Sequence, residues 1–492
     1  MEQNLSLYLH IPFCVRKCLY CDFLSGPQSA DVQEQYVEAL CREIQETSPE
    51  YREYQVVSVF IGGGTPSVLL PEQTIRIMET LKSCFTLTDT CEISMEMNPG
   101  TVTPEKMNAY CACGINRISI GLQSANDGEL KALGRIHTCA DFLKAYEMAV
   151  EAGFTNINVD LMSAIPEQTL KSYQETLQKV LALQPQPVHI SAYSLIVEEG
   201  TPFYEQELNL PDEETERRMY EITDDILRNA GYHRYEISNY AKAGKECVHN
   251  KVYWQRGNYL GLGIGSASLI QNVRFHNVTD IWSYVNLMLG ENSIGNEIEN
   301  AACLHIDMVE NLKKLKEEVQ ELPVEEQMEE FMFLGLRMME GVSERRFFEN
   351  FGRRFEEVFP GVIEKHEKLG LLEVIREDSE KIEIKEEPDL NEKCEEQQGK
   401  LREKEECQEE QHGTQQEKEE CREEQFGIIQ EMHRPGKKEI KKQEGKPQQE
   451  EQRKEKQEGK LQQEERGREF VSLRLTPHGI DVSNQVFVDF ML

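Results

Sequence analysis

The chain has 492 residues, with 54 Lys or Arg against 89 Asp or Glu, and its formal net charge is -35 at pH 7. This length predicts one large and one small unit, and so acidic a chain is not expected to bind nucleic acid or anionic lipid broadly. Most of the 14 cysteines stand singly in apolar or helical surroundings, and we find neither a signal-peptide pattern nor an apolar run that could span a bilayer, so we expect a reduced, cytoplasmic protein.

Short β-rich runs alternate with longer amphipathic stretches over residues 1–195. We expect strands at residues 5–10, 56–61, 91–96, 117–120, 156–161 and 188–193. The intervening helices are expected at residues 32–47, 71–84, 104–111, 140–152 and 169–182. Strands that alternate with helices form parallel sheets with right-handed crossovers, so this region predicts an α/β barrel core. In such barrels the functional residues lie at the C-terminal ends of the strands.

The remaining chain divides into three parts. Residues 196–300 are less regular and are interpreted as an extension of the barrel, with helices at 213–229 and 281–289. Residues 305–368 are expected to be entirely helical, including 325–339 and 343–351, and they lead into a short apolar run at 369–375. A further strand at 471–475 and a helix at 476–490 complete a C-terminal helical, winged-helix-like domain made of residues 301–376 and 470–492.

Residues 377–469 interrupt this C-terminal domain with a segment rich in Glu, Gln, Lys and Arg. Glycines recur every fourteen residues, and cysteines recur at nearly the same interval, at Cys394, Cys407 and Cys421. Because few apolar residues remain to be buried, we predict a disordered insertion. The even spacing of its cysteines favours repeat expansion over a metal site.

Three closely spaced cysteines, Cys14, Cys18 and Cys21, follow the first expected strand. Thiolates this close on one loop can bind a single metal centre. Three ligands leave one iron of a cubane iron–sulfur cluster open, whereas zinc more often takes a fourth Cys or His. The spacing alone does not decide between a cluster and incidental cysteines.

Polar residues recur at the ends of the later strands. A glycine triplet follows the second strand at residues 62–64, and the following strand ends carry Glu96, Gln123 and Asp160, with Arg135 in the loop after Gln123. Taken singly, each is more often structural: Glu96 or Asp160 as a helix cap, Gln123 as a loop residue, Arg135 as a surface ion pair. Their recurrence at successive strand ends, after the cysteine run, favours one shared site.

Residues 8–14, the cysteine run, residues 62–67 and residues 158–169 resemble the radical SAM superfamily, in particular its branch of oxygen-independent coproporphyrinogen III oxidase-like proteins. The resemblance covers the chain except for the insertion and implies a partial (β/α)6 barrel. It also implies that Cys14, Cys18 and Cys21 bind a [4Fe-4S] cluster whose open iron holds S-adenosylmethionine. By the same resemblance, the S-adenosylmethionine site comprises Tyr8, Tyr20, Gly63, Gly64, Thr65, Glu96, Gln123, Arg135 and Asp160.

Two departures separate this chain from the oxidases. Phe23 stands where the oxidases carry a further cysteine after the third ligand, and only thirteen residues precede Cys14, where the oxidases have a longer extension. The hexapeptide His-Asn-Lys-Val-Tyr-Trp at residues 249–254 resembles instead the signature of the HemW-type heme chaperones. An imidazole can ligate heme iron and aromatic rings can pack on a porphyrin.

The resemblance therefore implies a heme chaperone that binds heme through His249, Asn250, Tyr253 and Trp254 and transfers it to an acceptor protein. The alternative for the motif is a structural loop in which His249 is satisfied by Asn250 and the aromatic rings lie in the core. The alternatives for the function are coproporphyrinogen III oxidase and another radical SAM enzyme, so whether the chain is an enzyme stays open. An electron donor is implied if S-adenosylmethionine is cleaved.

Overall fold

The computed structural model describes residues 3–290, 308–376 and 470–492. Residues up to Ile375 and from Val471 onward belong to one compact unit. The predicted insertion at 377–469 lies outside the described residues, so its disorder and the interpretation of its cysteines stay predictions.

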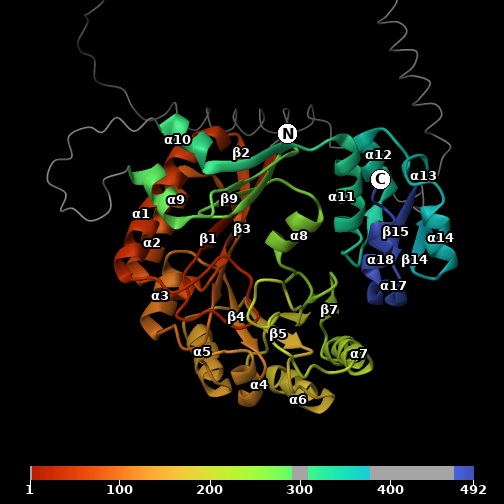
Figure 1. Ribbon diagram of the computed structural model, residues 1–492, viewed down its shortest axis with the longest axis horizontal. Coiled ribbons are helices and arrows are strands. Elements are labelled where there is room, and N and C mark those ends of the chain that lie inside the picture. Colours follow the sequence, from red (N-terminus) through yellow and green to blue (C-terminus); the bar gives the residue numbers. More distant parts are fainter. Residues whose placement is uncertain (1–2, 291–307, 377–469) are drawn as a thin grey trace, which may run out of the picture. The chain divides into compact units, whose positions relative to one another are not determined.

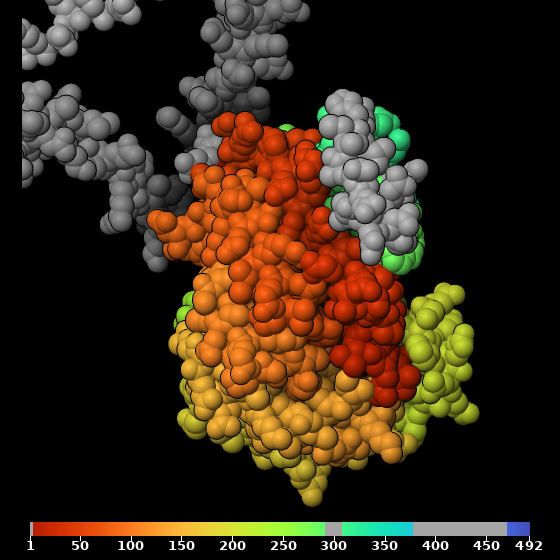
Figure 2. Space-filling model, turned by 90° about the vertical axis from the view of Figure 1, so that its left-hand side faces the viewer, coloured from red at the N-terminus to blue at the C-terminus, as the bar shows by residue number. Residues whose placement is uncertain are grey.

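All six strands expected in the first 195 residues are present, each adjacent and parallel to the next one along the chain. They are β1 (Gln3–Ile11), β2 (Tyr54–Gly63), β3 (Leu87–Met97), β4 (Arg117–Gln123), β5 (Ile157–Ser163) and β6 (His189–Ser194). The five expected helices lie between them, joined by the short α4 (Asp127–Ala132), which the sequence did not predict: α1 (Ala30–Thr47), α2 (Pro71–Cys84), α3 (Pro104–Ala112), α5 (Cys139–Glu151) and α6 (Leu170–Leu181). Figure 1 shows these helices on the outside of the sheet, and Figure 2 shows the outer face that the first of them form, red to orange. The expected partial barrel is confirmed.

The sheet continues beyond both edges of this barrel to twelve strands. Next to β1 it adds β9 (Tyr259–Leu262), β10 (Ala267–Ile270), β11 (Val273–Asn277) and β12 (Lys316–Glu321); next to β6 it adds β8 (Asn239–Ala241) and β7 (His233–Arg234). The expectation that residues 305–368 are entirely helical is wrong at the two-residue strand Val342–Ser343 and at β12, whose residues pair with β11. Five of its six residues are exposed, so pairing at the sheet edge decides this strand rather than burial of an apolar face.

Apolar and polar residues alternate over most of the six barrel strands. In β1, Leu5, Leu7 and Leu9 are fully buried in the main apolar core, while the residues between them, such as Ser6 and Tyr8, face the other side. Successive residues of a strand point to opposite faces of the sheet. Because the outer face packs on the helices, the polar alternates of all six strands face the barrel interior, which is therefore lined by hydrogen-bonding groups.

The C-terminal residues form a small sheet with helices, as expected for a winged-helix-like domain. Its strands lie in the order β13 (Val342–Ser343), β15 (Val471–Leu475) and β14 (Leu372–Arg376), so the two predicted wing strands are neighbours. Its helices are α11 (Val324–Gly335), α12 (Glu344–Phe351), α13 (Phe355–Val358), α14 (Val362–Lys368), α17 (Pro477–Asp481) and α18 (Ser483–Val488). The helix expected at 476–490 is thus two short helices. A separate hydrophobic core, including Phe331, Phe347 and Phe359, packs inside this part.

Between β6 and β12, the described residues form four more helices: α7 (Glu213–Asn229), α8 (Val248–Trp254), α9 (Ile281–Leu289) and α10 (Met308–Leu315). The positions of α7 and α9 agree with the sequence prediction. Among the described helices, none combines the length and the apolar character that crossing a bilayer requires.

Candidate functional site

The three clustered cysteines lie on the loop between β1 and α1, with their side chains partly exposed. The loop is held by backbone hydrogen bonds, including Cys14 N–H to the Gly26 carbonyl at 3.0 Å. Two side chains donate to the sulfurs: Thr65 Oγ1 lies 3.5 Å from Cys14 Sγ, and an Arg135 guanidinium nitrogen lies 3.6 Å from Cys18 Sγ. Such donors stabilise thiolates, the form that binds metal.

The three thiols lie close enough to influence one another electrostatically. Burial first, and then the neighbouring Cys18 and Cys14, raise the pKa of the Cys21 thiol, so the three sulfurs share one electrostatic environment. Within the described ranges, no three His, Cys, Asp or Glu side chains are arranged to hold one metal ion. In a cubane each cysteine binds a different iron, so the thiols need not converge on one point.

The glycine triplet at the end of β2 packs directly on this cysteine loop. Gly64 N–H donates to the Ile11 carbonyl at 2.9 Å, and Thr65 N–H donates to the Phe13 carbonyl at 2.7 Å. Gly63 has a φ of +107°, and a Cβ atom there would come within 2.4 Å of the His10 ring. The position therefore requires glycine.

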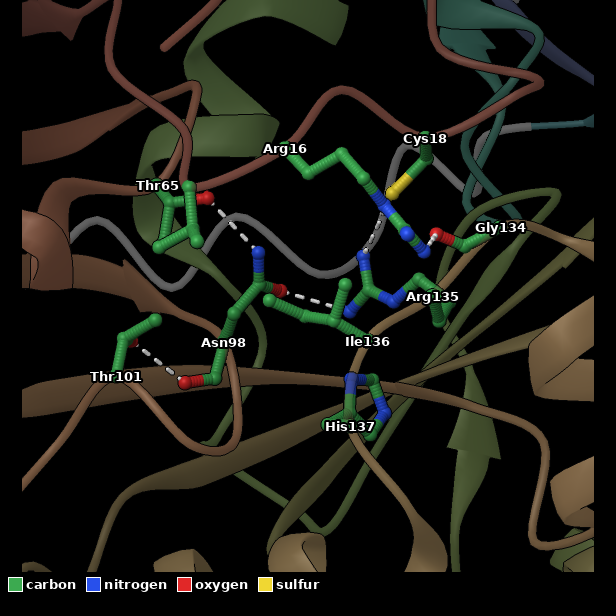
Figure 3. Close-up of a pocket in the computed structure, with 10 residues that line it drawn as sticks. Arg16, Cys18, Thr65, Asn98, Thr101, Gly134, Arg135, Ile136 and His137 are labelled. Atoms are coloured by element: carbon green, nitrogen blue, oxygen red, sulfur yellow. Dashed lines mark hydrogen bonds between the residues drawn. The ribbon is translucent and has the colours of Figure 1, made fainter. Parts of the chain in front are cut away.

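Arg135 is fixed by a chain of hydrogen bonds across three strand ends (Figure 3). Its guanidinium donates to Asn98 Oδ1 and to the Gly121 carbonyl, both at 2.7 Å, and Asn98 Nδ2 donates to Thr65 Oγ1 at 2.8 Å. Sequence reasoning did not select Asn98, although it directly follows β3 and lies two residues after Glu96. The chain of contacts joins the glycine turn to the cysteine loop.

A cavity of about 410 Å³ lies inside the barrel. It is within the range of roughly 300–1,000 Å³ typical of ligand pockets. Four residues predicted to bind S-adenosylmethionine line it, namely Tyr8, Gly63, Glu96 and Asp160, and so does Asn250. Burial, reinforced by Asp160, raises the pKa of Glu96 to about 8, while its carboxylate accepts the Gly63 N–H at 3.1 Å. Burial also raises the pKa of Asp160, which accepts hydrogen bonds from Ser119 and Asn158. Two neighbouring buried carboxyl groups of this kind favour a cationic ligand.

Tyr20 and Gln123 are near this region but do not line the cavity. The Tyr20 ring lies 6.5 Å from the Phe203 ring, and burial raises the pKa of its hydroxyl. Gln123 ends β4 at a register irregularity and has a φ of +69°. Of the nine residues predicted to bind S-adenosylmethionine, seven lie in the cavity wall, the glycine turn or the hydrogen-bond chain of Arg135. Tyr20 and Gln123 are the two that do not.

The hexapeptide at residues 249–254 forms most of α8. His249 is 1% exposed, with Nδ1 3.0 Å from Ser58 Oγ and Nε2 2.9 Å from the Tyr253 hydroxyl, and its ring stacks on Phe60. Burial, and to a lesser extent Arg117, lower the pKa of His249 to about 3, so its imidazole is neutral. The structural alternative predicted that Asn250 would be the hydrogen-bond partner of His249. The partners are instead Ser58 and Tyr253.

The other residues of the motif lie in different surroundings. The Trp254 ring is covered by the Arg337 guanidinium, whose carbon lies 4.3 Å from the ring centroid. Of the four residues predicted to contact heme, Asn250 is the one that borders the cavity.

Sequence reasoning missed the polar residues inside the strands. Arg117, Ser119, Asn158 and Ser191 line the cavity, in addition to the strand-end residues. Their signal is the alternation of polar and apolar residues around them, as in Arg117–Gln123 and residues 157–161.

Comparison with known proteins agrees with this geometry. Residues 8–180 match the radical SAM superfamily, and residues 322–377 match the HemN C-terminal domain. The heme chaperone HemW of Bacillus subtilis is 37% identical over 372 residues, which is 75% of this chain and 92% of that protein. The heme chaperone HemW of Escherichia coli is 39% identical over 263 residues, 53% of this chain and 69% of that protein. The structure of coproporphyrinogen III oxidase (HemN) from Escherichia coli, a radical SAM enzyme, shares the fold, with a TM-score of 0.64 at 22% identity over 76% of this chain and 85% of that one.

Proposed function

The chain belongs to the HemW family of radical SAM proteins, and from this premise we propose that it is a heme chaperone, which binds heme and passes it to an acceptor protein in the cytoplasm. The observation that carries the proposal is the similarity to named heme chaperones over nearly their whole length. Phe23, in place of a further cysteine, supports it against the oxidase.

The cluster and its cofactor are assigned to the residues described above. Cys14, Cys18 and Cys21 would hold a [4Fe-4S] cluster, which when bound supplies an electron and an open iron for S-adenosylmethionine. Arg135 and Thr65 donate hydrogen bonds to the thiolate sulfurs and so stabilise their negative charge. Glu96 and Asp160 supply the carboxylates that suit a sulfonium and an ammonium group, and the glycine turn leaves room for the amino-acid part of the ligand.

We assign His249 as a heme ligand, with Asn250, Tyr253 and Trp254 near the porphyrin. For this role, His249 Nε2 must exchange the Tyr253 hydroxyl for iron, because both ring nitrogens are engaged. The low pKa of His249 suits such a ligand, since a neutral imidazole binds metal.

The test is anaerobic reconstitution of the full chain, followed by heme titration and assays for two products. We expect a heme Soret band, transfer of heme to an apo-globin, and no conversion of coproporphyrinogen propionates to vinyl groups. Cys14→Ser, Cys18→Ser and Cys21→Ser should each lose cluster iron, whereas Cys139→Ser serves as a matched control. Decarboxylation of coproporphyrinogen would overturn the chaperone function in favour of the oxidase. Formation of 5'-deoxyadenosine would show that S-adenosylmethionine is cleaved.

A further inference from the structure

A buried guanidinium lies deep in the barrel cavity. Arg117 is the first residue of β4, is 2% exposed, and lines the cavity of about 410 Å³. One of its terminal nitrogens donates to Ser94 Oγ at 3.3 Å, but its Nε has no hydrogen-bond partner. Across the described part of the chain, no carboxylate lies within ion-pair distance of this guanidinium. A buried charge is normally paired, so an incompletely satisfied guanidinium facing a cavity indicates a ligand.

The nearest carboxyl groups are committed to other partners. Glu92 accepts the backbone N–H groups of Val248 and His249, at 3.2 and 3.3 Å, and so caps α8. Asp160 accepts hydrogen bonds from Ser119 and Asn158, at 3.0 and 2.7 Å. Among the described residues that line the cavity, Arg117 is also the one Lys or Arg. It is therefore the permanent positive charge available to a ligand there.

The outer part of the same cavity is apolar and open. Phe23, Leu24 and Tyr193 line it and remain 57%, 40% and 41% exposed. Tyr8 and Phe60 add aromatic rings to its wall. Besides the carboxyl groups of Glu96 and Asp160, which suit a cationic group, the cavity therefore offers aromatic rings to a large apolar body and a guanidinium to a carboxylate.

We propose that Arg117 binds a carboxylate of a second ligand, which enters the barrel beside the S-adenosylmethionine assigned to Glu96, Asp160 and the glycine turn, and that this carboxylate is a propionate of heme. The assignment rests on the proposed heme-chaperone function, which supplies a ligand with an apolar ring and two propionates. Because the exposed rings lie at the opening and Arg117 lies two residues deeper than Ser119 on the same strand, the propionate edge enters first.

The test compares two metal-free porphyrins, mesoporphyrin IX and its dimethyl ester, so that iron ligation makes no contribution. On the unmodified full chain, the diacid should bind about tenfold to a hundredfold more tightly than the ester, the ratio expected for a hydrogen bond to a charged group. Arg117→Met should remove this difference. Arg117→Lys keeps the charge but loses the planar fork, and should retain part of it. Arg52→Met, an exposed arginine outside the cavity, should bind both porphyrins as the unmodified chain does.

The outcomes separate the two proposals. Equal binding of diacid and ester by an unmodified chain that still binds hemin would overturn the role of Arg117 and leave the chaperone function standing. Failure of the unmodified chain to bind hemin and either porphyrin would overturn the chaperone function itself. If Arg117→Met does not fold, the diacid-to-ester ratio of the unmodified chain and of Arg117→Lys still decides the assignment.

Discussion

The hydrogen bond between His249 and Tyr253 allows the structural role of the α8 motif to be separated from its heme role. Three variants suffice: His249→Phe, Tyr253→Phe, and the two combined. Phenylalanine at position 249 keeps a ring against Phe60, whose centroid lies 5.2 Å from that of His249, and removes both ring nitrogens. Phenylalanine at position 253 removes only the hydroxyl.

The expected stabilities follow from which buried groups lose their partners. His249→Phe removes the bond to Ser58, which keeps its bond to Ser6 at 2.6 Å, and it orphans the Tyr253 hydroxyl. One lost hydrogen bond and one orphaned buried hydroxyl together cost about 2–4 kcal/mol of unfolding free energy. Tyr253→Phe orphans His249 Nε2 and costs about 1–3 kcal/mol. The double variant loses the shared bond only once, so its loss should be smaller than the sum by about 1–3 kcal/mol.

Urea unfolding followed by tryptophan fluorescence measures these differences, because Trp254, one of two tryptophans, directly follows Tyr253. Additive losses, to within about 0.5 kcal/mol, would refute the hydrogen bond as described. The double variant then tests the heme role in a chain that lacks the imidazole but keeps the fold. If His249 is a ligand, the heme Soret spectrum should change in His249→Phe and in the double variant, and remain in Tyr253→Phe. Unchanged heme affinity and spectrum in all three variants would show that His249 is structural.

Three further predictions concern other parts of the molecule. Burial raises the pKa of Glu96 to about 8, so between about pH 5 and pH 8 the folded chain binds a proton that the unfolded chain has lost. The free energy of unfolding should therefore fall across this range by up to about 1.4 kcal/mol per pH unit, and Glu96→Gln should flatten this dependence. Parallel pH profiles of the two proteins would contradict the raised pKa. Glu330 is buried and forms ion pairs with Arg256 at 2.9 Å and with Arg274 at 2.7 Å. Glu330→Gln should therefore lower the free energy of unfolding in urea by about 3 kcal/mol. The exposed control Glu340→Gln should lower it by less than about 0.5 kcal/mol. Replacing residues 377–469 by a short turn between β14 and β15, which are neighbours in the small sheet, should preserve soluble, cluster-loaded protein in iron and circular-dichroism assays; loss of that protein would contradict a dispensable insertion.

The barrel was predictable because each of its elements carries a local pattern. Two of its helices begin with proline in the first turn, at Pro71 and Pro104, and both begin there in the structure. The edge strands carry no such pattern. In β12, five of six residues are exposed and most are charged, so only its pairing with β11 makes it a strand. Pairing partners that are distant in sequence are not visible in a local pattern.

The candidate site was predictable at the strand ends and not inside the strands. Glu96 stands out as an acidic residue at the end of an expected strand, and Asp160 stands out as a charged residue that interrupts an apolar one, although in the structure it lies inside β5. Arg117 and Asn158 also interrupt apolar strands, but alternation of polar and apolar residues is usual for a sheet with one face in water. Here the polar face lines the barrel interior, and only the closure of the six strands around a common space distinguishes the two cases.

The α8 motif shows why spacing alone does not assign a ligand role. Residues four apart lie on one face of a helix, so the spacing between His249 and Tyr253 places them in contact, and their side chains are hydrogen-bonded. Asn250 falls on a different face and borders the cavity. The spacing that would place an imidazole and a phenol together beside a porphyrin therefore also lets the two side chains form a hydrogen bond with each other. A heme ligand role for His249 requires this pair to separate, and the pair of single variants with their double variant measures the free energy that separation must overcome.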